Sequence, residues 1–130
     1  MKAFIDTNVL IYAQGVGPKS KTARRAILAG GVISVQVLNE FVDVLRRKFR
    51  FEWEVIAEAL ADVRAALDQV RPVSVETHTS AVALARAHGF RFYDALILAS
   101  ALDAGCDTLL TEDFQTGRRV DGLTIVNPFV

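Results

Sequence analysis

The chain has 130 residues, a length that typically forms one domain around one hydrophobic core. Its composition, 52% hydrophobic and 23% charged, excludes the weakly hydrophobic and highly charged profile of disordered proteins. Fifteen basic and fifteen acidic side chains cancel, so net charge attracts neither a nucleic acid nor an anionic membrane. A polyanionic substrate would therefore need a local basic patch or a bound metal ion.

Short apolar runs alternate with helical patterns along the chain. Strands are expected at residues 2–5, 32–33, 73–75, 106–111 and 123–126. Helices are expected at residues 9–13, 19–29, 35–49, 53–67, 79–88 and 94–104, with Asn8 and Ser34 as N-caps and Gly30, Gly89 and Gly105 near the C-terminal ends. Because helices separate successive strands, we expect an α/β fold over residues 1–130: a single three-layer domain with a mainly parallel central sheet flanked by helices on both faces.

Cysteine content and hydropathy restrict the cellular compartment in which the protein is expected to act. Cys106 is the single cysteine, which excludes an internal disulfide and a cysteine-rich zinc site. The short apolar run before Asp6 is not typical of a signal peptide, and the nearly apolar residues 95–102 are fewer than the ~20 that span a bilayer. We therefore expect a cytoplasmic protein without a membrane partner.

Acidic residues stand where ligands bind in such a sheet, beyond the carboxyl ends of the strands. Asp6 follows the first strand, and Asp113 follows the strand that ends at Thr111. Glu112 stands beside Asp113, and either of the two could face the cleft. Asp94 begins a helix that is apolar almost all round, so its side chain should face the protein or a cleft. Clustered carboxylates stay ionised when a hard cation binds them, and oxygen ligands suit Mg²⁺ or Mn²⁺.

Each of these residues also has a purely structural interpretation. Asp6 and Asn8 can cap a helix, Asp94 can interact with a helix dipole, and Asp113 can form a turn. Glu40 lies opposite the apolar stripe of its helix, so spacing alone predicts a solvated surface residue.

Four acidic segments, in order along the chain, resemble PIN-domain ribonucleases, particularly the VapC-type toxins of type II toxin–antitoxin pairs. They are residues 4–12, 37–41, 92–97 and 110–114. The resemblance implies a PIN-like fold with Asp6, Glu40, Asp94 and Asp113 as catalytic acids, and with Asp6, Asp94 and Asp113 as metal ligands. It also implies that Asn8 and Thr111 orient the carboxylates or the attacking water.

The same resemblance implies a function and partners. It implies a Mg²⁺-dependent endoribonuclease, with Mn²⁺ as an alternative ion, that forms a homodimer and is silenced by a cognate antitoxin. RNA contacts are expected from the basic residues that flank the loop after the first motif, Lys19, Lys21, Arg24 and Arg25. Reversing the charge of Lys21 and Arg24 should weaken RNA binding in a salt-dependent way.

Other functions stay open at this point. A PIN-fold module could bind nucleic acid without cleaving it, or act on DNA instead of RNA. A haloacid-dehalogenase-like phosphatase fits poorly, because it needs an aspartate where Asn8 stands and a lysine beyond Lys48, the last in the chain. We expect the stripe of Trp53, Ile56 and Leu60 to pack in the core, with contact to the antitoxin partner as the alternative.

Overall fold

The computed structural model describes residues 2–130 and contains one six-stranded sheet. The strands are β1 (Ala3–Ile5), β2 (Val32–Ser34), β3 (Gln69–Arg71), β4 (Thr108–Leu110), β5 (Arg119–Val120) and β6 (Leu123–Val126). Their order across the sheet is β3-β2-β1-β4-β6-β5. Every neighbouring pair is parallel except β5 and β6, which are antiparallel.

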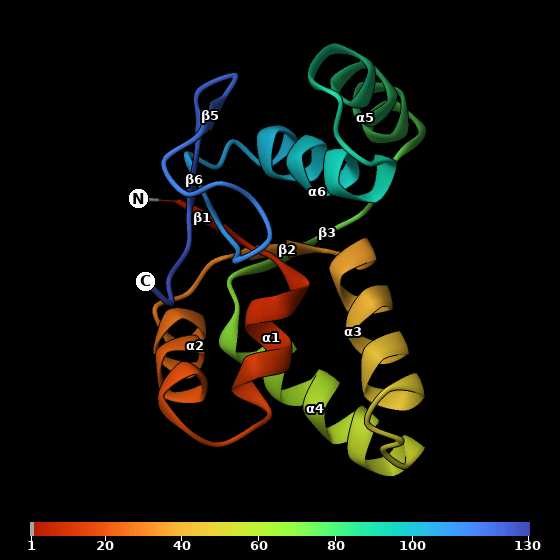
Figure 1. The fold of residues 1–130 in the computed structure, drawn as a ribbon. Coiled ribbons are helices and arrows are strands. Elements are labelled where there is room, and N and C mark those ends of the chain that lie inside the picture. Colours follow the sequence, from red (N-terminus) through yellow and green to blue (C-terminus); the bar gives the residue numbers. More distant parts are fainter. Residues whose placement is uncertain (1) are drawn as a thin grey trace.

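Helices cover both faces of the sheet, as Figure 1 shows. One face carries α1 (Thr7–Ala13), α2 (Pro18–Leu28), α3 (Val35–Arg47) and α4 (Trp53–Ala66), and the other carries α5 (Val75–His88) and α6 (Phe92–Asp103). The predicted α/β architecture with a mainly parallel central sheet is confirmed. Among residues 2–130, no helix combines the length and the apolar character needed to cross a membrane.

The core lies on both sides of the short central strands. Phe4, Ile5 and Leu109 are fully buried because helices cover both faces of β1 and β4. Helix α6 is buried from Ala95 to Ala101, since it lies between the sheet and α5. The helix that is apolar on all sides is thus the most enclosed one, as its sequence predicts.

Helix ends follow the predicted capping residues, with one exception. Ser34 Oγ accepts a hydrogen bond from the Val37 backbone nitrogen at 3.4 Å, which caps α3. Gly89 adopts the left-handed conformation that ends α5, at a φ of 73°. The first helix begins earlier than expected, because Asp6 caps it instead of Asn8.

Two strand predictions were wrong. The third strand lies at Gln69–Arg71, parallel to β2, and not at residues 73–75. Pro72 cannot donate a hydrogen bond to a sheet, and the Ser74 side chain caps α5, which begins at Val75. Sequence analysis also missed β5, which pairs with β6 through a tight turn.

A two-residue turn joins β5 to β6. Asp121 and Gly122 both have positive φ, 49° and 88°, as the turn of a two-residue hairpin requires.

Trp53 is 55% exposed and packs against the Arg46 guanidinium, which lies 5.0 Å from the ring centroid. The expectation that Trp53 packs in the core was therefore wrong. Ile56 is buried as expected.

The strand order places a topological switch at the centre of the sheet. The chain passes from β1 to β2 and β3 on one side, then crosses to β4 on the other side of β1. The carboxyl ends of β1 and β4 therefore lie side by side while their connections diverge, which is where α/β proteins bind ligands.

Candidate active site

Asp6 is held at the end of β1 by contacts with β4 and α1. Its backbone nitrogen donates to the Leu110 carbonyl oxygen at 3.0 Å, extending the β1–β4 pairing by one residue. Its Oδ1 accepts from the Thr7 backbone nitrogen at 2.7 Å, and its Oδ2 accepts from Thr111 Oγ1 at 2.9 Å. The side chain is only 5% exposed, so both carboxylate oxygens are fixed by hydrogen bonds.

Asn8 links the first helix to the loop after β4. Its Nδ2 lies 3.0 Å from Thr111 Oγ1, 3.1 Å from Asp113 Oδ2 and 3.5 Å from Asp6 Oδ2. Its Oδ1 accepts from the Glu112 backbone nitrogen at 3.3 Å. One amide therefore reaches both strand-end carboxylates, and the segments around Asp6 and Asp113 lie together as predicted.

Thr111 completes this network from the end of β4. It is fully buried, and its hydroxyl donates to Asp6 while accepting from Asn8 and from the Asp113 backbone nitrogen at 3.1 Å. Every hydrogen-bonding capacity of the hydroxyl is used. Asn8 and Thr111 therefore contact the carboxylates that they were expected to orient, and their role in catalysis stays a prediction.

Glu40 joins this site, so its assignment to a solvated surface from helical spacing was wrong. Its Oε2 accepts from Thr7 Oγ1 at 3.2 Å, and its Oε1 accepts from Gln36 Nε2 at 3.1 Å. The side chain is half-buried because α1 packs against α3 and covers the border of the apolar stripe. Spacing within α3 cannot show this contact, since α1 belongs to another segment.

Asp94 lies in the first turn of α6 and is half-buried. It lines a cavity of about 440 Å³ together with Glu40. Glu40 also lines a second cavity, of about 480 Å³, with Asn8 and Asp113. We call the region formed by Asp6, Glu40, Asp94 and Asp113 the acidic cleft.

The electrostatics of the acidic cleft agree with this proximity. Burial raises the pKa of Asp6 to about 7, although hydrogen bonds from Thr111 and Thr7 oppose the rise. The charges of Asp113 and Glu40 raise the Asp6 pKa further. Burial also raises the pKa of Asp94; nearby Arg91 opposes this shift and Asp113 adds to it.

The oxygen-rich donor set fits a hard divalent cation. Within residues 2–130, no three His, Cys, Asp or Glu side chains are arranged closely enough to bind one ion together. Mg²⁺ does not require such a cage, because it commonly binds one or two carboxylates and keeps water or substrate phosphates as its other ligands. A cation would also relieve the repulsion that raises the pKa of Asp6.

Comparison with known proteins assigns the family. The PIN domain family model matches residues 3–123. This chain belongs to the PIN domain family. That assignment confirms the family resemblance of the four acidic motifs and removes the haloacid-dehalogenase-like alternative. No curated protein matches the sequence.

Solved structures share the fold of this PIN domain. A toxin–antitoxin complex from Klebsiella pneumoniae has a TM-score of 0.72 at 24% identity over 98% of each chain. VapBC2 from Rickettsia felis, bound to a promoter DNA fragment, has a TM-score of 0.71 at 22% identity over 96% of this chain and 97% of that one. The sarcin–ricin-loop-cleaving toxin VapC20 from Mycobacterium tuberculosis has a TM-score of 0.68 at 22% identity over 83% and 87%.

Glu112 and Asp113 are neighbours in this PIN domain but face different groups. Glu112 Oε1 accepts from the Tyr12 hydroxyl at 2.8 Å, and its Oε2 pairs with Lys19 Nζ at 3.4 Å. Asp113 instead contacts Asn8 and raises the pKa values of Asp6 and Asp94. Glu112 lines the same cavity as Asp113, but its carboxylate is paired with Tyr12 and Lys19, so Asp113 is the acid that joins the hydrogen-bonded network of Asn8 and Asp6.

The four basic residues expected to contact RNA are not equivalent. Lys19 pairs with Glu112, and Arg24 Nη1 donates to the Ala13 and Gly15 carbonyl oxygens after α1, at 3.1 and 3.0 Å. Lys21 is exposed. Arg24 thus has a structural role, and the expectation of a shared RNA-binding role stays a prediction.

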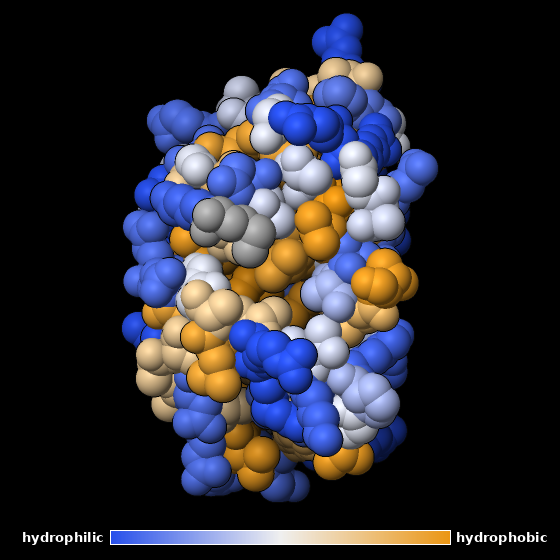
Figure 2. All heavy atoms as spheres, turned by 90° about the vertical axis from the view of Figure 1, so that its left-hand side faces the viewer, coloured by the Kyte–Doolittle hydropathy of each residue, from blue (hydrophilic) through white to orange (hydrophobic). Residues whose placement is uncertain are grey.

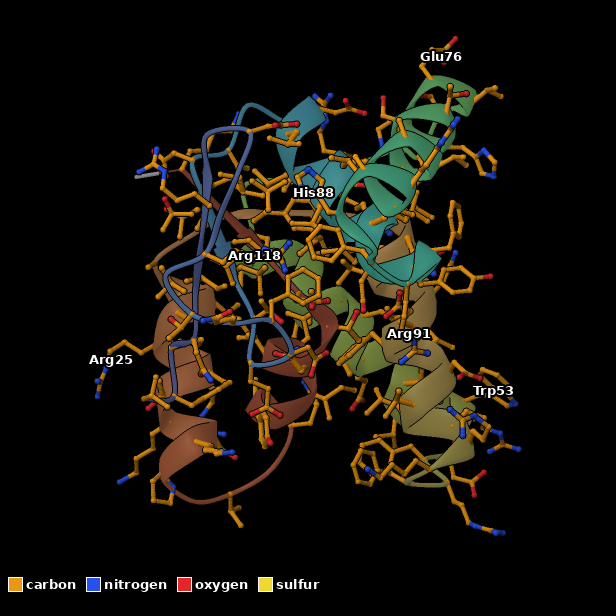
Figure 3. The ribbon with its side chains drawn as sticks, turned by 45° about the horizontal axis from the view of Figure 1, so that its top comes forward. Arg25, Trp53, Glu76, His88, Arg91 and Arg118 are labelled. Carbon is orange, nitrogen blue, oxygen red and sulfur yellow. The ribbon has the colours of Figure 1, made fainter. Side chains whose placement is uncertain are left out.

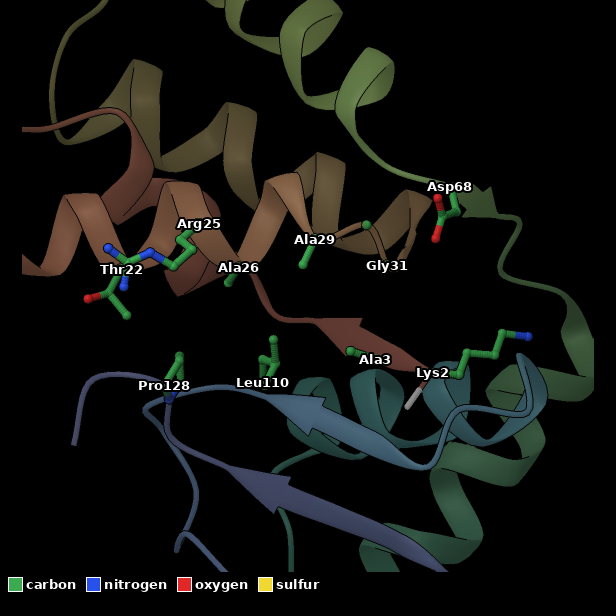
Figure 4. Close-up of a pocket in the computed structure, with 11 residues that line it drawn as sticks. Lys2, Ala3, Thr22, Arg25, Ala26, Ala29, Gly31, Asp68, Leu110 and Pro128 are labelled. Carbon is green, nitrogen blue, oxygen red and sulfur yellow. The ribbon is translucent and has the colours of Figure 1, made fainter.

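Arg25 lines a different cavity, which Figure 4 shows between α2 and the sheet. This cavity of about 380 Å³ includes Ala26, Asp68 and Leu110 but none of the four acids. Figure 2 shows apolar side chains gathered at the centre of the face that carries α2 and the C-terminal end, and Figure 3 shows Arg25 projecting outward from α2. This cavity is therefore separate from the acidic cleft.

Proposed function

We propose that this PIN domain is a divalent-metal-dependent endoribonuclease and the toxin of a toxin–antitoxin pair. The observation that supports the proposal is the acidic cleft itself: Asp6, Glu40 and Asp113 belong to one hydrogen-bonded network at the switch point of the sheet, and Asp94 lines a cavity with Glu40. The hydrogen bonds to Asp6, Glu40 and Asp113 come from neutral side chains and a backbone amide, which orient these acids without neutralising them. Such a site favours a bound cation over an internal ion pair.

The residues of the cleft have distinct tasks in this proposal. Mg²⁺ or Mn²⁺ would bind one or two carboxylates of the set Asp6, Asp94 and Asp113, with water and substrate phosphates as its other ligands. When bound, the ion would lower the pKa of a water molecule and neutralise charge on the scissile phosphate. Thr111 fixes the orientation of Asp6, and Asn8 ties Asp113 to the same network. Glu40, which accepts hydrogen bonds from Thr7 and Gln36, would accept a proton from the attacking water.

The partners in this proposal are inferred from structures that share the fold. Two of the similar structures are toxin–antitoxin assemblies, and a third is a toxin that cleaves the sarcin–ricin loop. We therefore extend the proposal to an RNA substrate, a cognate antitoxin, a homodimer and a cytoplasmic site of action, with the whole chain acting as a single PIN-like domain.

The test is cleavage of total RNA by the purified protein with Mg²⁺, with Mn²⁺ and with EDTA. Asp6→Asn should lower the cleavage rate at least about 100-fold, since the ion contributes several kcal/mol of charge stabilisation. Asp68→Asn is the matched control, because Asp68 lines the α2-side cavity and not the cleft. It should cleave as the wild type does.

Three outcomes would contradict the proposal. Full activity of Asp6→Asn would exclude the acidic cleft as the catalytic site. Cleavage in EDTA would exclude metal dependence. Binding of RNA without any cleavage, or cleavage of DNA alone, would favour the non-catalytic or the DNA-directed alternative.

A further inference from the structure

Two cavities extend from the acidic cleft, and Glu40 lines both of them. The cavity of about 480 Å³ contains Asp113 and also Lys48 and Phe49 from the end of α3. The cavity of about 440 Å³ contains Asp94 and also Arg91 and Tyr93 from the start of α6. The acids therefore lie between two differently built arms, one at α3 and one at α6.

Each arm combines a basic side chain with an exposed aromatic ring. Phe49 is 45% exposed, and Lys48 Nζ lies 5.7 Å from its ring centroid. Tyr93 is 62% exposed, and Arg91 lies two residues before it and beside α3 in Figure 3. Neither Lys48 nor Arg91 takes part in the two ion pairs found within residues 2–130.

We propose that these two arms bind single-stranded RNA on either side of the scissile phosphate. Phe49 and Tyr93 stack on unpaired bases, and Lys48 and Arg91 contact the flanking phosphates. This inference rests on the proposed ribonuclease function and names the side chains that hold its substrate beside the acidic cleft.

The chemistry of the arms selects an unpaired strand. An aromatic ring can stack on a base only when the face of that base is free, so a duplex cannot use Phe49 and Tyr93. Phosphates need local cations here, because the protein has a net charge of +0. A peptide filling the cleft would instead bring its own cations to the carboxylates and would gain nothing from Lys48 and Arg91.

A third aromatic cluster near the cleft lacks this property. Phe90 stacks on Phe114 with 5.8 Å between ring centroids, and the Arg118 guanidinium lies 4.5 Å from the Phe90 centroid. Phe90 is half-buried and already packs against Phe114 and Arg118, so this cluster joins the loop after β4 to the α5–α6 connection and offers less ring surface to a base than the exposed Phe49 and Tyr93.

The test measures binding without cleavage. Asp6→Asn protein is titrated into a fluorescein-labelled single-stranded RNA of about 12 nucleotides in Mg²⁺, and fluorescence anisotropy reports the Kd. Adding Phe49→Ala or Tyr93→Ala should weaken binding about 5- to 100-fold, the range for loss of one stacked base. Phe49→Tyr and Tyr93→Phe should retain affinity, because both keep the ring.

Trp53→Ala is the matched control. Trp53 is 55% exposed and packs against the Arg46 guanidinium, so it is the same type of pair outside both cavities. Its removal should leave the Kd unchanged. Arg91→Glu and Lys48→Glu should each weaken binding and reduce the salt dependence by about one released counterion.

The outcomes separate this inference from the proposed function. Unchanged affinity of both alanine variants, an equal loss with Trp53→Ala, or an equal loss for duplex RNA would overturn the inference. Normal RNA binding together with lost binding of a protein partner would assign the arms to that partner. If the wild type binds RNA through Phe49 and Tyr93 yet cleaves none, the proposed function fails and the inference stands.

Discussion

Two neighbouring regions of this PIN domain differ in the groups that surround their carboxylates. In the acidic cleft, amides and hydroxyls orient Asp6, Glu40 and Asp113, and within residues 2–130 no cationic side chain donates a hydrogen bond to these acids. In the adjoining cluster, the Glu112 carboxylate accepts from the Tyr12 hydroxyl and pairs with Lys19. The second region, which we call the Tyr12 cluster, neutralises its acid within the protein.

The difference shows how a fold distinguishes a structural acid from a functional one. The Tyr12 cluster also raises the pKa of Lys19, first through its hydrogen bond with Tyr12 and then through Glu112. In the cleft, burial and neighbouring acids instead raise the pKa of Asp6. Unneutralised charge that is costly to bury indicates a site prepared for an external cation.

The largest difference between the two regions is expected when each of the two adjacent acids, Asp113 and Glu112, is replaced by its amide. Asp113→Asn should reduce RNA cleavage on the order of 100-fold, because it removes a carboxylate from the proposed metal site. Glu112→Gln should leave cleavage within about twofold of wild type, and the loss of a partly exposed ion pair should cost about 1 kcal/mol of stability or less. Initial rates with Mg²⁺ would measure both effects, and equal losses would contradict the distinction.

The buried Asp6 carboxyl of the acidic cleft should also make the free energy of unfolding depend on pH. The folded-state pKa of Asp6, about 7, exceeds its ordinary value of 3.8, so the unfolded carboxyl ionises first as the pH rises. The free energy of unfolding should therefore fall between about pH 4 and pH 7 in EDTA. Asp6→Asn should lack this contribution and be more stable than wild type at pH 8 by roughly 2 kcal/mol.

Thermal unfolding at several pH values would measure this effect. Adding Mg²⁺ should narrow the gap between wild type and Asp6→Asn, since a cation stabilises the ionised carboxylate. A wild-type protein whose stability stays flat across this range, relative to Asp6→Asn, would argue against a raised Asp6 pKa.

The smallest expected effect concerns the neutral side chain at the centre of the cleft. Thr111→Val should cost about 1–2 kcal/mol of stability, because buried groups on Asp6 and Asn8 and the Asp113 backbone nitrogen lose a hydrogen-bonding partner. Thr111→Ser keeps the hydroxyl and should lose about half as much. Urea denaturation would compare the two variants, and an equal cost for both would assign Thr111 a packing role alone.

Sequence patterns predicted most of the elements because those patterns are local. The fully apolar run after Asp94 predicted the buried helix α6, and Ser34 and Gly89 predicted helix ends. The third strand was misplaced because Gln69–Arg71 is a half-exposed strand with little apolar signal. Its pairing with β2, and not its composition, makes it a strand.

Sequence patterns were enough to predict that Asp6 and Asp113 follow strands and that a mainly parallel sheet brings them to one edge. Only the tertiary structure decided that Glu40 belongs with them, that Glu112 does not, and that Arg24 supports the end of α1. Periodicity along one element reports which face is apolar, but contacts between distant segments depend on how helices pack across the sheet. The position of α1 against α3 turns a residue with a surface pattern into part of the cleft.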